Sequence, residues 1–194
     1  MKAAVFFGQK RIDIEDKPVP KIGPKDALVK VGYCGICGSD RYMWRDAWIF
    51  PLTPENKPAK LPHRLENTPG HEVTGTIVEL GKDVEGFKVG DKVAIYCIMY
   101  CGECYYCSKG ESKRCETFDS RIMGIYSPGG YAEYMPSPSR CLCKLPDDIP
   151  LDLGNLTLDT IGVPYGAFRE IGVDPSKSYA CLLYTSPSPR DRTR

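Results

Sequence analysis

The chain has 194 residues, a formal net charge of +1, and 42% hydrophobic and 26% charged side chains. This composition is typical of a soluble globular domain, because the apolar content is too high for a disordered chain and the near-zero charge predicts neither a nucleic-acid nor a membrane partner. No stretch approaches the roughly 20 apolar residues that cross a bilayer, and the apolar run at residues 3–7 is too short for a secretory signal. We therefore expect a cytoplasmic protein.

Predicted strands dominate the first half of the chain. Short apolar or alternating runs, separated by glycine and proline, indicate strands at residues 2–7, 11–19, 26–33, 74–80 and 91–95. A helical pattern follows only at residues 150–171, and the proline-rich residues 50–68 are typical of an irregular surface excursion. Many short strands joined by turns favour a mainly β fold with short helices, built as a compact barrel or sandwich.

Four cysteines form the strongest motif of the chain. Cys101, Cys104, Cys107 and Cys115 give the spacing C-x2-C-x2-C-x7-C. Four thiolates saturate a tetrahedral zinc ion and leave no position for a substrate, so such a site is structural. An iron–sulfur cluster is the rival, but ferredoxin runs continue with x3-C-P, whereas here seven residues precede the fourth cysteine. The spacing therefore predicts a structural zinc loop at residues 101–115.

The remaining strand-flanking cysteines are expected to be buried thiols rather than ligands: Cys34, Cys97, Cys141 and Cys143. Alternation along a strand would place Cys141 and Cys143 on one face. Ten cysteines without an export signal indicate a reducing compartment, where clustered thiols bind metal more often than they form disulfides.

A second metal site is indicated by residues far apart in the chain. Cys37 lies in the segment G-I-C-G-S-D, and His71, one of only two histidines, lies in G-H-E. At these residues the chain resembles the zinc-containing alcohol dehydrogenases of the medium-chain dehydrogenase/reductase superfamily. Their signature G-H-E-x2-G-x5-G-x2-V is satisfied from Gly70 to Val84, with C-G-S-D upstream and the four-cysteine loop downstream. The resemblance covers residues 1–180.

The resemblance implies a set of site residues. Cys37 and His71 match two ligands of a catalytic zinc ion, and Glu72 matches the adjacent carboxylate, which is a ligand only occasionally. Asp159 takes the place of the third ligand by its spacing to Ala167. Its alternative role is that of a helix N-cap, which aspartate performs commonly.

The resemblance also implies a proton relay. Ser39 matches the hydroxyl that binds the substrate oxygen and begins the relay. Tyr42 stands where many relatives have histidine, which leaves the next step of the relay open.

The implied fold is a GroES-like, partly open β-barrel that spans residues 1–170, with residues 171–180 leading into a Rossmann domain. No G-x-G-x-x-G occurs in the chain, so we expect the Rossmann domain itself to be missing and the chain to be inactive alone. Residues 181–191 match the translation of a transposon-type sequencing adapter, so we expect residues 181–194 to be an artefact; a disordered Ser/Pro/Arg tail is the alternative.

The implied activity is the interconversion of an alcohol and its aldehyde or ketone. The substrate would be a secondary alcohol, a polyol, a sugar or a threonine-type alcohol, and the parent protein would use one catalytic zinc, one structural zinc, and NAD or NADP. A homodimer or homotetramer is expected for that parent. A non-enzymatic, zinc-stabilised GroES-like binding module is the alternative, and it would need only the zinc of the four-cysteine loop.

Overall fold

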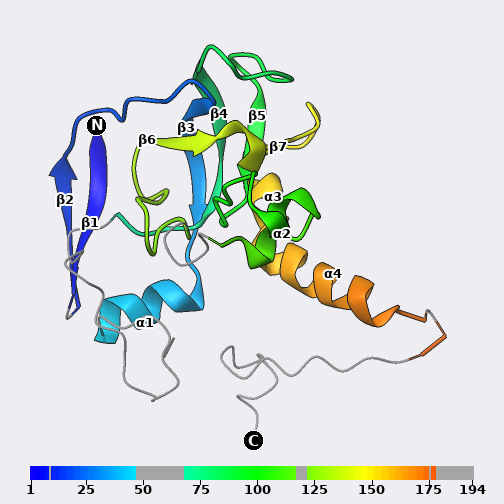
Figure 1. Ribbon diagram of the computed structural model, residues 1–194. Coiled ribbons are helices and arrows are strands. Elements are labelled where there is room, and N and C mark those ends of the chain that lie inside the picture. Colours follow the sequence, from blue (N-terminus) through cyan, green and yellow to red (C-terminus); the bar gives the residue numbers. More distant parts are fainter. Residues whose placement is uncertain (9, 47–67, 117–121, 175, 178–194) are drawn as a thin grey trace, which may run out of the picture.

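Two antiparallel sheets form the body of the protein in the computed structural model (Figure 1). The hairpin of β1 (Lys2–Gly8) and β2 (Arg11–Asp16) forms the smaller sheet. The larger sheet has the strand order β6-β3-β4-β5-β7, made from β3 (Asp26–Gly35), β4 (Glu72–Leu80), β5 (Lys92–Ile95), β6 (Tyr134–Pro138) and β7 (Leu142–Lys144). The structure describes residues 1–8, 10–46, 68–116, 122–174 and 176–177.

The two sheets meet along one seam. An isolated antiparallel bridge joins Ala3 to Ala132, the amide of Ala4 donates to the Tyr131 carbonyl at 2.7 Å, and the amide of Glu133 donates to the Lys2 carbonyl at 3.0 Å. This seam closes one side of a partly open barrel. The expected mainly β fold with short helices is confirmed.

Side chains of three adjacent strands of the larger sheet form the core. Val29 of β3, Val73 and Ile77 of β4, and Val93 and Ile95 of β5 are fully buried. Burial of each such side chain contributes about 1.5–3 kcal/mol. The strand ends that carry the candidate site therefore rest on a packed and regular sheet.

Four α-helices lie in the described part of the chain: α1 (Gly38–Asp46), α2 (Tyr105–Ser108), α3 (Leu151–Leu156) and α4 (Asp159–Ile171). Two 3-10 turns accompany them, η1 (Ser112–Arg114) and η3 (Ser139–Cys141). None of these helices is both long and apolar enough to cross a membrane.

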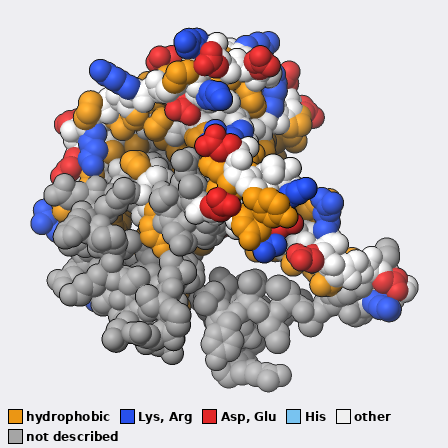
Figure 2. All heavy atoms as spheres, in the orientation of Figure 1, with side chains coloured by type: hydrophobic (Ala, Val, Ile, Leu, Met, Phe, Trp, Pro, Cys, Tyr) orange, Lys and Arg blue, Asp and Glu red, His pale blue; other side chains and the backbone are white. Residues whose placement is uncertain are grey.

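The helix predicted at residues 150–171 is two helices. Thr157 still has helical angles, but Leu158 has φ −76° and ψ −113°, which is outside the helical region and turns the chain. Helix α4 projects from the body of the molecule (Figure 1) and has no buried residue. Several of its apolar side chains are exposed (Figure 2), namely Ile161, Val163, Tyr165, Phe168 and Ile171.

Three further differences from the predictions have physical causes. Strand β2 ends at Asp16, three residues before the predicted end. Strand β6 was not predicted because it contains Pro136 and Pro138; it lies at the edge of the sheet, where proline is tolerated. Helix α1 was not predicted, since Met43 is its only buried apolar residue among those whose burial is described; its other buried residue is Asp40.

The prediction for the paired cysteines near β7 is wrong. Cys141 is buried, but it belongs to the turn η3 and not to the strand, so the two-residue alternation does not reach it. Cys143 lies in β7 and is exposed. The predicted surface excursion, apart from residue 68, and the predicted artefact at residues 181–194 lie outside the described residues.

Candidate metal centre

Cys37 lies where β3 gives way to α1. Its backbone amide donates to Asp40 Oδ2 at 2.8 Å, and the Asp40 amide lies 3.2 Å from the Cys37 carbonyl. A carboxylate three residues into a helix that accepts the N–H of the residue before it is a common way to fix a helix start. The Cys37 side chain is therefore held at a defined turn.

Strand pairing brings His71 to the same place. Gly35 at the end of β3 pairs with Glu72 at the start of β4, so His71 and Cys37 lie close together although 34 positions separate them in the sequence. Gly70, just before His71, has φ +94°, a conformation that favours glycine. A Cβ atom there would also lie 2.7 Å from Cδ1 of Tyr131, so the ring packs directly on the backbone that precedes His71.

Four potential metal donors converge at this point. One donor atom from each of Cys37, His71, Glu72 and Asp159 lies within 4.8 Å of all the others. His71 Nε2 is 3.4 Å from Asp159 Oδ2, and the Cys37 thiol donates to that oxygen at 3.7 Å. Ser39 Oγ lies 3.5 Å from the same histidine nitrogen. The structure therefore brings together all five residues that were predicted for the catalytic site.

Asp159 does not cap its helix through its side chain. Helix α4 begins at Asp159, its N-cap residue is Leu158, and no side-chain cap hydrogen bond is present. The carboxylate instead faces His71. This orientation favours the ligand role, which stays a prediction.

Electrostatics favour a cation among these side chains. Burial alone would lower the pKa of His71, but hydrogen bonds with Asp159 and Cys37 raise it to about 10. A hydrogen bond with His71 lowers the pKa of the Cys37 thiol, more than burial raises it. Burial, followed by the negative charge of Asp159, raises the pKa of Glu72. The cluster thus stabilises a thiolate and a positive charge beside it.

The surroundings of the other ring nitrogen of His71, Nδ1, also favour a metal ion at this cluster. In the described part of the chain, His71 Nδ1 and Asp40 Oδ1 are the buried side-chain nitrogen and oxygen atoms without a hydrogen-bond partner, and they face each other at 3.7 Å. A metal on Nε2 would fix the ring proton on Nδ1, where a carboxylate can accept it, as is usual for metal-binding histidines. The residues present therefore fit a zinc ion.

Asp40 is itself held by Tyr131. The phenol hydroxyl lies 3.0 Å from Asp40 Oδ2 and 3.2 Å from the Gly35 carbonyl oxygen. Sequence reasoning missed both residues. Asp40 ends the C-G-S-D segment and stands three positions after Cys37, which is a capping signal; no comparable signal marks Tyr131.

We expect Asp40→Asn to weaken zinc binding at this site by roughly 10- to 100-fold, because it removes the carboxylate charge that faces His71 Nδ1. Competition with a chromogenic chelator measures the affinity. Asp26→Asn is the control, since within the described residues that carboxylate accepts only the Gly23 amide, at 3.1 Å, at the opposite end of β3. Equal zinc affinity in the two variants would contradict the role of Asp40.

The four-cysteine loop forms the second cluster. One sulfur atom from each of Cys101, Cys104, Cys107 and Cys115 lies within 4.8 Å of the others. The amide of Cys101 donates to Cys115 Sγ and the amide of Cys104 donates to Cys101 Sγ, both at 3.3 Å. Such bonds stabilise thiolates, so the loop backbone is arranged for a metal that four sulfurs enclose.

Tyr100 and Arg140 tie the base of this loop to the barrel. Arg140 Nε donates to the Tyr100 carbonyl at 2.7 Å, and the Tyr100 hydroxyl donates to the Arg140 carbonyl at 3.0 Å. Tyr100 immediately precedes Cys101, so the loop leaves the barrel from a fixed point.

A cavity of about 570 Å³ adjoins the first cluster, and both His71 and Asp159 line it. Its remaining walls come from β5 and the residues after it, from β7, from Lys113 of η1, from the turn between α3 and α4, and from α4. Most of these side chains are apolar or small, and the volume is typical of a site for a small molecule. The cavity therefore provides space for a substrate beside the metal donors.

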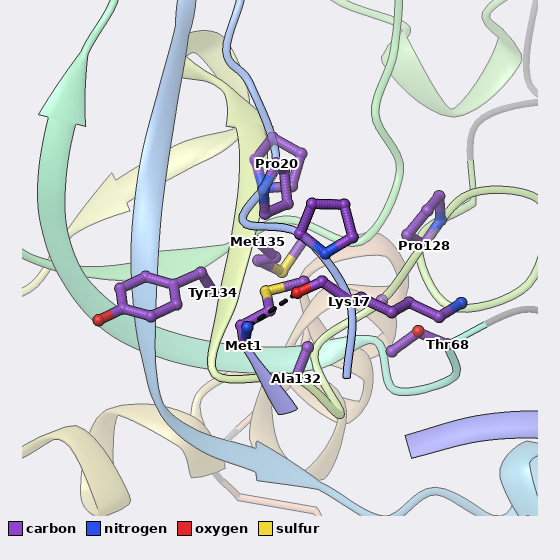
Figure 3. Close-up of a pocket in the computed structure, with 11 residues that line it drawn as sticks. Met1, Lys17, Pro20, Thr68, Pro128, Ala132, Tyr134 and Met135 are labelled. Carbon is purple, nitrogen blue, oxygen red and sulfur yellow. Dashed lines mark hydrogen bonds between the residues drawn. The ribbon is translucent and has the colours of Figure 1, made fainter. Parts of the chain in front are cut away.

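A smaller cavity of about 180 Å³ lies elsewhere, beside the N-terminus (Figure 3). The Met1 ammonium group donates to the Lys17 carbonyl at 2.8 Å across it. Four prolines line it, and its described lining contains no Asp, Glu, His or Cys. It holds no metal-binding group and stands apart from the site above.

Two further cysteines lie near the first cluster without joining it. Burial, then the negative charge of Asp40, raises the pKa of the Cys34 thiol to about 12. Burial, then the charge of Asp159, raises the pKa of Cys97 to about 11. Both therefore favour the protonated form, which is a poor metal ligand.

Comparison with known proteins places the chain in a family. A profile described as the alcohol dehydrogenase GroES-like domain matches residues 23–147. The chain is 38% identical over 181 residues to the NAD-dependent alcohol dehydrogenase of Sulfolobus acidocaldarius, which covers 92% of this chain and 50% of that protein. It is 33% identical to the L-threonine 3-dehydrogenase of Pyrococcus horikoshii, with 80% and 41% covered.

The solved structure of acetophenone reductase from Geotrichum candidum in complex with NAD is similar, with a TM-score of 0.75, 28% identity, and coverage of 89% of this chain and 48% of that one. The chain belongs to the alcohol dehydrogenase family and has its GroES-like domain. The expected GroES-like fold and the resemblance to these dehydrogenases are confirmed. The chain spans about half the length of the curated relatives it matches.

Proposed function

We propose that the chain supplies the metal and substrate site of a zinc-dependent alcohol dehydrogenase that uses NAD or NADP. The carrying observation is the convergence of donor atoms from Cys37, His71 and Asp159, beside Glu72, at the wall of a cavity. Three protein ligands leave a tetrahedral zinc ion one open position, which is typical of a catalytic site.

The chain's own residues suit alcohol chemistry. Zinc at this point would act as a Lewis acid that lowers the pKa of the substrate hydroxyl. Ser39, 3.5 Å from His71 Nε2, lies where its hydroxyl can accept the substrate proton. Tyr42, one turn further along α1, is 48% exposed, so we place it at the solvent end of that proton route.

The cavity has few charged side chains. Its walls are mostly apolar, and besides the potential donors His71 and Asp159 its charged side chains are Lys113 of η1 and Glu170 of α4. We infer a small secondary alcohol, polyol, sugar or threonine-type alcohol as the substrate. We place the zinc-binding unit at residues 1–170, with residues 171–180 leading to the dinucleotide-binding part of a homodimeric or homotetrameric whole protein.

Cobalt substitution tests the open site on the 194-residue chain itself. We expect two metal ions per chain, and imidazole should change the visible spectrum of only one of them. An exogenous ligand can join an ion with three protein ligands, whereas an ion enclosed by four thiolates has no free position. One cobalt per chain, with a spectrum that imidazole leaves unchanged, would contradict the proposal and favour the non-enzymatic module.

A further inference from the structure

The placement of Asp159 needs an explanation that α4 does not supply. Asp159 is the first residue of α4, yet this helix has no buried residue along its 13 positions. Its carboxylate nevertheless lies 3.4 Å from His71 Nε2, which belongs to a segment 88 positions earlier. The restraint on Asp159 must therefore come from the residues before it.

The anchored element is α3, which lies against the sheet while α4 projects away (Figure 1). Its buried residues are Gly154 and Asn155. A Cβ on Gly154 would lie 2.5 Å from Leu145 Cδ1, so this helix packs on Leu145 at backbone distance. The hydroxyl of the fully buried Thr74 donates to the Leu151 carbonyl at 2.8 Å.

Asn155 connects α3 to the strand that follows His71. Its side chain is buried, and Nδ2 donates to the Glu72 carbonyl at 2.7 Å, with the Tyr33 carbonyl at 3.5 Å. One amide thus reaches both β4 and β3 beside the metal donors. A buried amide with such partners holds its segment in one position, since breaking the contact leaves polar groups unpaired.

Backbone hydrogen bonds connect Asn155 to the residues on either side of Asp159. The Asn155 carbonyl accepts the amide of Leu158 at 3.1 Å, and the Leu158 carbonyl accepts the amide of Gly162 at 2.7 Å. Asp159 stands between these two bonds. A shift of Asn155 relative to Glu72 would therefore move Asp159 relative to His71.

We propose that Asn155 is a positioning residue for the metal site: its amide ties the turn between α3 and α4 to the start of β4 and so sets the Asp159 carboxylate at donor distance from His71. This inference rests on the donor set of the proposed function. Asn155 does not itself line the cavity, and its side-chain amide meets the Glu72 and Tyr33 carbonyl oxygens rather than the ligand atom of any metal donor.

A double-variant cycle on zinc affinity tests the inference. Asn155→Leu keeps the branched shape of the side chain and its number of heavy atoms but removes the donor, and we expect it to lower zinc affinity at the open site by roughly 10- to 100-fold. Asp159→Asn should lower it at least as much. The double variant should bind no more weakly than Asp159→Asn alone, because without the carboxylate there is nothing left to position. The readout is zinc competition with a chromogenic chelator.

Two internal controls keep the test decisive. A melting temperature close to that of the parent chain shows that each variant is folded, and Leu156→Ala, an exposed position next to Asn155, should keep full affinity. Unchanged affinity in Asn155→Leu, or additive losses in the double variant, would overturn the inference while the ligand set stands. No effect of Asp159→Asn would overturn the inference and the proposed ligand set together.

Discussion

Cys104→Ser is expected to destabilise the chain by roughly 3–5 kcal/mol and to remove one zinc ion, because binding free energy at a closed thiolate site is also folding free energy. The loop has little else to hold it: within residues 101–116 only Cys115 is buried, and neither α2 nor η1 buries a residue. For a chain of this size the loss corresponds to a fall in melting temperature of about 10 °C. Thermal denaturation followed by circular dichroism, with metal analysis, measures both effects.

Cys143→Ser is the matched control for that variant. Cys143 is a thiol of β7 that is exposed and lies outside both clusters of potential ligands. The Cys143→Ser variant should therefore have the melting temperature of the parent chain and keep two zinc ions. A Cys104→Ser chain that melts with the parent and retains two zinc ions would show that residues 101–115 do not form a structural metal site.

The strands of the barrel were predictable because the alternation of apolar residues and the glycines and prolines between the runs indicate the same boundaries. β1, β3, β4 and β5 lie where the apolar runs predicted them, within three residues at each end. Elements whose residues give a weak or contrary sequence pattern were not predictable. Helix α1 buries one apolar side chain, Met43, beside the polar Asp40, and β6 carries two prolines that only an edge strand accepts.

The residues of the two metal clusters also differ in how far the sequence predicted them. Spacing alone indicated the four-cysteine loop, since its ligands are close in the sequence. The resemblance supplied Cys37, His71 and Asp159, which come together only when β3, β4 and α4 are assembled. Asn155 could not be predicted at all, because its role depends on one carbonyl, that of Glu72, reached from 83 positions away.

Cys37→Ser is expected to remove the second zinc ion and leave the fold largely intact. The thiolate is a strong zinc ligand, and a serine hydroxyl with its much higher pKa does not replace it. The surrounding strands are held by their own ladder, in which Cys34 pairs with Val73 and Gly35 with Glu72. Metal analysis should fall from two zinc ions to one, with a melting temperature close to that of the parent chain.

Cys34→Ser is the control that decides which thiol matters, because the two cysteines are three positions apart and differ in pKa. Hydrogen bonding with His71 lowers the pKa of Cys37, whereas burial and the charge of Asp40 raise the pKa of Cys34 to about 12. Zinc competes with protons for a thiolate, so only the first thiol binds it readily near neutral pH. Cys34→Ser should therefore keep two zinc ions. If it instead loses one while Cys37→Ser keeps both, the ligand has been assigned to the wrong cysteine, and the open site would have to be rebuilt around Cys34.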